Sequence, residues 1–177
     1  ASGLSREHIV KSGLRYLQEN PDEPLTIARV AAASGAATMA IYRHFESRAD
    51  LAEAILAEAL HELTVIPSSD KPWQEELRSW MTLLTERLTQ TPQCNALLDT
   101  PTGLSPTWLR AAASLQHILG QSGLKGEKLS QAVFFVSTVA VGYARLILAA
   151  PFEQTIEPTV ASIANMQRDL PKAMAGF

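Results

Sequence analysis

The sequence contains a single cysteine among its 177 residues, Cys94. One thiol excludes an internal disulfide and fits the reducing environment of the cytoplasm. Long hydrophobic runs are also missing, because the longest one, residues 132–144, is interrupted by Ser137 and Thr138. A membrane span needs ~20 apolar residues, and no basic and apolar leader opens the sequence. We therefore expect a cytoplasmic protein that does not bind a membrane.

The sequence also lacks the residue patterns of a metal site or a catalytic centre. The four histidines do not have the spacing of metal ligands. They are His8, His44, His61 and His117. No glycine-rich phosphate loop is present, and no nucleophile is paired with a base. We expect no metal, no cofactor and no enzymatic activity.

The chain is slightly acidic, with 15 lysine and arginine residues, 18 aspartate and glutamate residues and a formal net charge of −3. Residues 1–50 hold six basic and six acidic side chains, so the excess of acid lies in residues 51–177. A neutral segment can still bind a nucleic-acid duplex if its basic side chains converge on one side. The charge predicts weak electrostatic steering but does not exclude DNA as a partner.

Apolar residues recur at helical spacing along most of the chain. Ile9, Gly13, Tyr16 and Leu17 mark the first helix, which ends before Pro21. The further helical windows, each bounded by proline or glycine, are residues 50–64, 72–90, 106–121, 127–149 and 156–173. No short window alternates between apolar and polar residues as a strand does. The sequence predicts an all-α fold.

One part of the sequence has the pattern of a helix-turn-helix. Thr26 is a suitable N-cap for a helix, and Gly35 permits the left-handed turn that redirects the chain. A second short helix is expected from about residue 37 to residue 44, with Ile41 and Phe45 facing inward. Two helices joined by a short glycine-containing turn match the helix-turn-helix motif.

The residues around this motif resemble a known family. Ser47 and Asp50 have the spacing of a capping box that starts another helix. Together with this box, "REHIVKSGLRYL" and "LTIARVAAASGAATMAIYRHFESRADL" resemble the DNA-binding domain of the tetracycline-repressor (TetR) family. The resemblance covers roughly residues 4–60. It implies an N-terminal three-helix domain, residues 1–50, and a larger helical domain for effector binding and dimerisation, residues 51–177.

The resemblance also implies which residues meet DNA. The residues expected to meet base edges are Ala37, Thr38, Met39, Ala40 and Arg43. The residues expected to meet phosphates are Thr26, Tyr42, His44 and Arg48. The family usually has Ser or Thr at position 37 and often Thr at position 40. Here both are alanine, so two hydroxyl contacts to base edges are missing. Readout is then expected to depend on Thr38, on apolar contacts of Ala37, Met39 and Ala40 with thymine methyls, and on Arg43.

The larger domain is where family members hold a small effector. The candidate ligand-binding residues are Trp73, Trp80, Met81, Leu84, Trp108, His117, Phe134, Phe135, Tyr143 and Arg145. His117 and Arg145 are the candidate polar anchors. An aromatic or methionine stripe at helical spacing also occurs as plain hydrophobic core, and this alternative stays open for the apolar members of the set.

The window 127–149 is apolar almost all round, which requires cover on both faces. One face can pack on its own domain and the other on a second copy of the chain. The candidate dimer-interface residues in this window and in the last helix are Val133, Val136, Ala140, Ala144, Leu148, Val160, Ile163 and Ala164. The alternative is a central core helix in a monomer.

These observations predict a homodimeric transcriptional regulator that binds a palindromic operator in double-stranded DNA. We expect a repressor that a small-molecule effector releases from the operator. The alternative is a helical protein of the same fold that binds a ligand or a protein and does not recognise a DNA sequence. Ala37 and Ala40 keep this alternative open.

Overall fold

The structure, a computed structural model, describes residues 4–67, 71–100 and 103–149. The chain divides into two compact units, Ala1–Arg145 and Leu146–Phe177. The second unit is described only over residues 146–149, which end the last described helix. The expected helix over residues 156–173 lies outside the described residues, as do the interface candidates Val160, Ile163 and Ala164.

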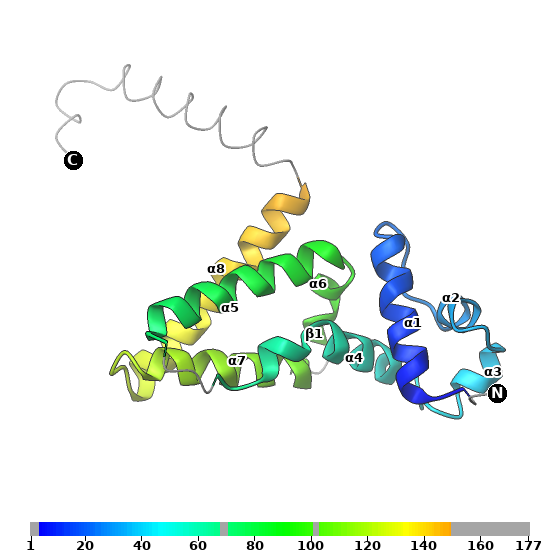
Figure 1. Cartoon of the computed structure of the whole chain (residues 1–177), viewed down its shortest axis with the longest axis horizontal. Coiled ribbons are helices and arrows are strands. Elements are labelled where there is room, and N and C mark those ends of the chain that lie inside the picture. The colour runs from blue at the N-terminus through cyan, green and yellow to red at the C-terminus, as the bar shows by residue number, and fades with distance from the viewer. Residues whose placement is uncertain (1–3, 68–70, 101–102, 150–177) are drawn as a thin grey trace, which may run out of the picture. The chain divides into compact units, whose positions relative to one another are not determined.

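The described residues form an almost wholly helical fold, as predicted (Figure 1). The helices are α1 (Arg6–Glu19), α2 (Ile27–Ala33), α3 (Thr38–Ile41), α4 (Arg48–Ala59), the 3-10 helix η1 (His61–Thr64), α5 (Trp73–Gln90), α6 (Cys94–Leu97), α7 (Pro106–Gly120) and α8 (Gly126–Ala149). Two strands of two residues each, β1 (Asp99–Thr100) and β2 (Gly103–Leu104), pair antiparallel. Strands this short carry no alternating pattern, and the sequence did not predict them.

Four helices begin at a hydroxyl side chain that accepts a hydrogen bond from an amide of the first turn. The pairs are Ser5 with His8 at 3.1 Å, Thr26 with Arg29 at 3.3 Å, Ser47 with Asp50 at 3.1 Å and Ser105 with Trp108 at 3.0 Å. Each bond satisfies an amide that has no partner within its helix. The N-cap roles predicted for Thr26 and Ser47 are confirmed.

The first hydrophobic core joins α1, α2, α3 and α4. Its fully buried members include Ile9, Leu17, Val30, Ile41, Phe45 and Ile55. The helices approach most closely at Gly13, where an added Cβ would lie 2.8 Å from the Ile55 Cδ1 atom and 3.2 Å from the Val30 Cγ1 atom. A glycine at this position therefore lets α1 lie directly against α2 and α4.

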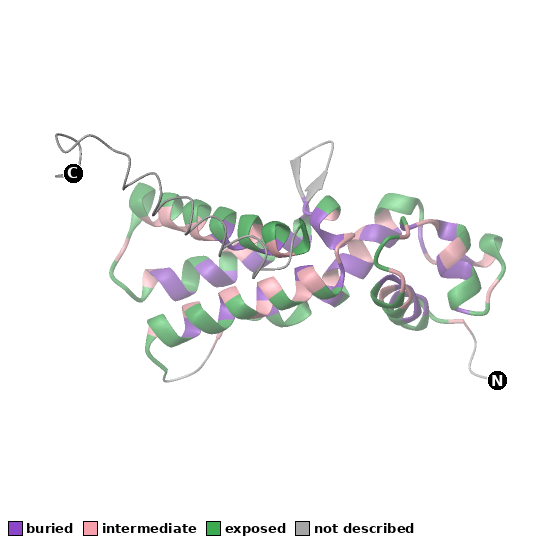
Figure 2. Ribbon diagram, turned by 90° about the horizontal axis from the view of Figure 1, so that it is seen from above, coloured by how far each residue is buried: buried purple, intermediate pink, exposed green. Residues whose placement is uncertain are grey.

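The second core lies among α5, α7, α8 and the end of α4, and Figure 2 shows buried residues along the inward sides of the helices. It includes the tryptophans Trp80 and Trp108, whose ring centroids are 6.4 Å apart. Adjacent residues of α4 belong to different cores, Ile55 to the first and Leu56 to the second. The predicted domain boundary at residues 50 and 51 falls within α4, a helix that both cores share.

Cys94, at the start of α6, is fully buried in the second core. Burial raises the pKa of its thiol to about 12, because the thiolate would lose its hydration in apolar surroundings. The side chain therefore stays neutral and packs as a small hydrophobic residue.

Candidate nucleic-acid interface and ligand pocket

The turn between α2 and α3 is held by local hydrogen bonds. Gly35 has a φ of 66°, the left-handed conformation predicted for it. The Ser34 hydroxyl donates to the Val30 carbonyl at 2.7 Å, and the Ala36 amide donates to the Ala31 carbonyl at 2.9 Å. These bonds satisfy the last carbonyls of α2 and fix the direction in which α3 leaves the turn.

Helix α3 is shorter than predicted. It spans Thr38–Ile41 instead of residues 37–44, and the chain continues as a tight turn in which the His44 amide donates to the Ile41 carbonyl at 2.9 Å. Its N-cap residue is Ala37, which makes no side-chain hydrogen bond to the first turn. An alanine at this position leaves the helix start without the cap that Ser or Thr would supply.

The side chains expected to read DNA project outward from this segment. Met39 is 73% exposed and Tyr42 is 49% exposed, whereas Ile41 between them is fully buried. Ala37, Thr38 and Arg43 are also exposed, and Ala40 and His44 are half-buried. The fold therefore presents most of the predicted base-reading and phosphate-binding side chains on the outward side of residues 37–43. Their contacts with DNA stay a prediction.

Arg48 and Thr26 lie close together although they are distant in sequence. The Arg48 Nε atom donates to the carbonyl of Leu25, the residue before Thr26, at 3.0 Å. Among the described residues no carboxylate forms an ion pair with Arg48, so its terminal nitrogens are available to a phosphate. Two of the predicted phosphate contacts thus occupy one place beside the start of α2.

Arg6 is an important residue of this region that the sequence analysis did not identify. Its guanidinium forms an ion pair with Asp50 at 2.9 Å, donates to the His44 carbonyl and lies 4.1 Å from the centre of the Phe45 ring. The hydrogen bond from Arg6 lowers the pKa of the Asp50 carboxyl below its usual value. Arg6 therefore ties α1 to the end of the reading segment and to the start of α4.

Ion pairs decide which basic side chains of residues 1–50 remain free. The pairs are Arg6 with Asp50 at 2.9 Å, Lys11 with Glu7 at 2.7 Å and Arg29 with Glu23 at 2.7 Å. Within the described part of the chain, Arg15, Arg43 and Arg48 have no acidic partner. Arg43 lies within the exposed segment and Arg48 follows it by five residues, so this surface carries two cations without an acidic partner among the described residues.

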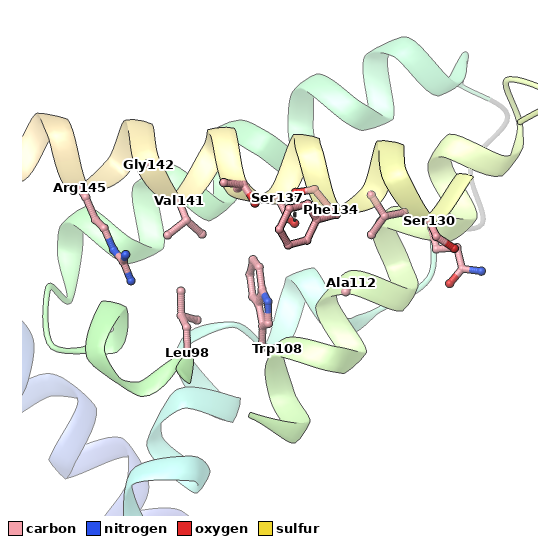
Figure 3. Close-up of a pocket in the computed structure, with 12 residues that line it drawn as sticks. Leu98, Trp108, Ala112, Ser130, Phe134, Ser137, Val141, Gly142 and Arg145 are labelled. Carbon is pink, nitrogen blue, oxygen red and sulfur yellow. Dashed lines mark hydrogen bonds between the residues drawn. The ribbon is translucent and has the colours of Figure 1, made fainter. Parts of the chain in front are cut away.

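A pocket of about 450 Å³ lies between α7 and α8 (Figure 3). It brings together three of the predicted ligand-binding residues, Trp108, Phe134 and Arg145. The lining residues that the sequence analysis did not identify are Leu98, Ala112, Gln116, Ser130, Ser137, Thr138, Val141 and Gly142, together with Val133 from the predicted dimer interface. No local sequence pattern indicates that small or polar residues of an apolar helix line a cavity.

The other predicted ligand-binding residues lie outside this pocket. Trp80 and Leu84 are buried in the second core, against which Trp73 and Met81 pack. Trp80 also borders a separate cavity of about 210 Å³. His117 is exposed on α7, and Phe135 and Tyr143 point outward from α8. Trp73, Trp80, Met81 and Leu84 therefore pack as part of the hydrophobic core, which is the alternative that the sequence left open for them.

The predicted dimer face of α8 is corrected by the structure. Ala140 is 1% exposed and Ala144 is 0% exposed, because both pack in the second core of their own subunit, with Val133 and Val136 against the same core. The opposite side, with the exposed residues Phe135, Val139 and Tyr143, forms the outward face of α8. Leu148 near the end of the helix is exposed as well. Both sides are apolar, so hydrophobicity alone could not distinguish them.

Helix α8 is longer than the apolar run that the sequence analysis weighed as a membrane span. By length and composition it could cross a membrane, and only 17% of its most apolar window is buried in the described structure. The same length and composition occur in helices that a second protein chain covers. The length and composition of α8 are therefore only weak evidence for a membrane location. Within the described part of the subunit, however, much of its apolar surface is not covered by other residues.

Comparison with known proteins places this geometry in a family. Residues 9–55 match the family described as bacterial regulatory proteins, tetR family. Over these residues, which form the helix-turn-helix and its flanking helices, the chain matches the TetR family. A TetR-family regulator from Streptomyces coelicolor is 20% identical, with a TM-score of 0.72 over 98% of this chain and 84% of that chain. BioQ bound to its double-stranded DNA operator is 19% identical, with a TM-score of 0.68 over 92% of this chain and 99% of that chain. Both structures share the TetR fold.

The curated relatives of this chain include nucleoid occlusion factors. SlmA of Shewanella pealeana is 26% identical over 171 residues, which cover 87% of each chain. SlmA of Shewanella amazonensis is 39% identical over a shorter stretch of 51 residues, which covers 29% of this chain and 26% of the relative. The similarity to the first relative extends well beyond the DNA-binding domain.

Proposed function

We propose that this protein is a homodimeric transcriptional regulator that binds double-stranded DNA and responds to a small molecule held by its larger domain. The observation that carries the proposal is the exposed segment with Thr38, Met39, Tyr42 and Arg43, which projects from a helix-turn-helix of the TetR family. We infer a repressor that leaves its operator when the effector binds.

The residues of the interface divide into two groups by chemistry. The phenol of Tyr42 and the guanidinium groups of Arg43 and Arg48 suit phosphate oxygens, which position a protein on a duplex. Thr38 and Met39 suit base edges and thymine methyls, which carry the sequence information. Because Ala37 and Ala40 offer no side-chain hydrogen bond, we expect phosphate contacts to supply most of the affinity and the preference among sequences to be shallow.

Dimerisation is proposed to use the outward face of α8. Two such faces, one from each subunit, would remove Phe135 and Val139 from water and place the two reading segments in successive major grooves, ~34–36 Å apart. An effector that binds better to a state with a different separation weakens DNA binding by linkage, typically by ~1–3 kcal/mol. The dimer is therefore the element through which a ligand acts on the operator.

The second candidate function is a helical binding protein of this fold without sequence-specific DNA recognition. It is favoured by the two alanines of the reading segment, since Ala37 neither caps α3 nor can bond a base edge. The two candidates differ in one measurable property, the enrichment of a DNA sequence by the folded dimer.

Selection of binding sites from random double-stranded DNA tests the proposal. We expect the wild-type protein to enrich a short palindrome, and we expect Thr38→Ala to flatten the preference at one or two positions of each half-site while non-specific binding is kept. Thr82→Ala, which alters an exposed threonine on α5, is the matched control and should leave the selected sequence unchanged. A long, sharp palindrome that survives Thr38→Ala would place the reading residues elsewhere. No enrichment by a folded dimer would favour the second candidate.

The phosphate role of Arg48 is tested by salt dependence. Arg48→Ala is expected to weaken binding to all DNA sequences by a similar factor and to reduce the slope of log affinity against log salt by about one. Tyr42→Phe removes an uncharged contact and should weaken binding without changing the slope. The matched control is Arg78→Ala, an exposed arginine on α5. An unchanged slope for Arg48→Ala would argue against a phosphate contact.

A further inference from the structure

The pocket between α7 and α8 contains one cation and no anion among the twelve residues that line it. The cation is Arg145, whose Nη2 atom donates to the carbonyl of Asn95 at 3.2 Å. Within the described part of the chain it forms no ion pair with a carboxylate. A guanidinium has five N–H donors, so several remain for a ligand. In a chain with a net charge of −3, this pocket is a local site of positive charge.

The walls of the pocket are mainly apolar and aromatic. Trp108 extends from α7 toward α8, and Phe134 extends from α8 into the same space (Figure 3). Leu98 and Val141 complete the apolar lining on the side where Arg145 descends from α8. The volume, about 450 Å³, is within the ~300–1,000 Å³ that small-molecule sites have. Trp108 is 8% exposed and Phe134 is 73% exposed, so a flat ring between them would lie against the core on one side and stack on an exposed ring on the other.

Two neutral polar side chains also face the pocket without a partner of their own. Gln116 and Thr138 line it, and neither makes a side-chain hydrogen bond with another described residue. They can donate to or accept from a ligand. The pocket thus has an apolar body, one cation and a few neutral hydrogen-bonding groups, the composition of a site that orients an amphipathic anion.

We propose that this pocket binds a small aromatic carboxylic acid, with its carboxylate on Arg145 and its ring between Trp108 and Phe134. The inference rests on the proposed function, in which the larger domain holds an effector, and it names the chemical class of that effector. Arginine suits this role because its planar fork matches the two oxygens of a carboxylate. A neutral or cationic ligand would leave the guanidinium without its best partner.

The position of the pocket gives such a ligand a short connection to the DNA-binding domain. The amide of Thr107, the residue before Trp108, donates to the Glu53 carboxylate of α4 at 2.8 Å. Glu53 lies five residues after Arg48, which starts α4 beside the reading segment. A ligand that shifts Trp108 would also shift the start of α7, which is hydrogen-bonded to Glu53 of α4. Through α4, a carboxylic acid bound here could therefore change the spacing of the two reading segments.

Calorimetric titration of the purified full chain tests the proposal with three acids and their neutral amides: benzoate, phenylacetate and 2-naphthoate. We expect at least one acid to bind about ten times more tightly than its amide, a preference limited by the exposure of Arg145 to solvent. Arg145→Gln should remove this preference and Arg145→Lys should keep part of it. Phe134→Ala should weaken the acid and the amide by similar factors. The control Arg78→Gln should bind as the wild type does.

The proposal is overturned if acids and amides bind equally, if the preference survives Arg145→Gln, or if none of the six compounds binds at millimolar concentration. Site selection on the ligand-free protein separates this outcome from a failure of the proposed function. A chain that selects an operator but does not prefer acids contradicts only the ligand class. A chain that prefers acids through Arg145 but enriches no DNA sequence contradicts only the regulatory function.

Discussion

Phe135→Glu is expected to produce a folded monomer that binds its operator far more weakly than the wild type. Phe135 is 69% exposed on the outward face of α8, so the glutamate meets water in the monomer and costs little there. In a dimer it would place a charge in an apolar interface, which is strongly unfavourable. Loss of the second reading segment removes the gain from bivalent binding, and operator affinity should fall by about 10²–10⁴-fold. Sedimentation velocity and DNA titration measure the two effects.

The opposite side of α8 provides the matched control. Ala144→Glu introduces the same charge at a position that is 0% exposed within the subunit's own core. An unpaired charge buried there should destabilise the larger domain by about 3–5 kcal/mol, and the protein should unfold or aggregate. Circular dichroism during heating distinguishes this result from that of Phe135→Glu. If Phe135→Glu remains a dimer, the interface lies on another surface. If Ala144→Glu is a folded monomer, the interface includes Ala144, as the sequence predicted.

The contrast between these two positions explains why part of the assembly could not be predicted from sequence. Helical periodicity identifies which side of a helix is buried only when the other side is polar. In α8 both sides are apolar, and a series of small residues such as Ala140 and Ala144 suits close packing within a subunit as well as between subunits. The choice between the two is made by α7, which directly precedes α8, and by α5, which is distant in sequence, because both contribute to the core on one side of α8.

The helix-turn-helix was predictable because its determinants are local. Thr26 and Ser47 cap helices within three residues of themselves, and Gly35 adopts the left-handed turn that its lack of a side chain permits. The length of α3 was not predictable in the same way. The helix ends at Ile41, and Arg6, which is 38 residues away from His44 along the chain, donates to the His44 carbonyl in the tight turn that follows.

The ligand pocket was predictable from sequence in part. Trp108 and Phe134 were predicted from residue type alone, and residue type cannot say whether an aromatic side chain lines a cavity or fills a core. Trp80 has the same chemistry and is buried against Trp108 at a ring distance of 6.4 Å. Arg145 was singled out, together with His117, as a candidate polar anchor for the ligand. Its hydrogen bond to the Asn95 carbonyl joins residues 50 positions apart, which no local pattern reveals.

Phe45→Ala is expected to unfold the DNA-binding domain while the larger core persists. Phe45 is 1% exposed, and its side chain fills the space among α1, α3 and α4 and supports the Arg6 guanidinium on its ring face. Removing a buried phenylalanine typically costs ~3–5 kcal/mol, because the cavity collapses only in part. Met39→Ala, at a position that is 73% exposed on the same segment, is the matched control and should change stability by less than about 0.5 kcal/mol.

Amide hydrogen exchange locates the loss that Phe45→Ala causes. Helix α4 belongs to both cores through Ile55 and Leu56, so its amides report on each domain. We expect exchange in α1, α2 and the first half of α4 to accelerate by about 10²–10³-fold, the factor that ~3–4 kcal/mol of lost local stability gives. Amides of α5 and α7 should keep their protection, because Leu84 and Leu115 remain packed in the second core. Equal acceleration in all helices would instead mean that the two cores unfold as one cooperative unit through α4, and the division of the chain at residue 50 would have no energetic meaning.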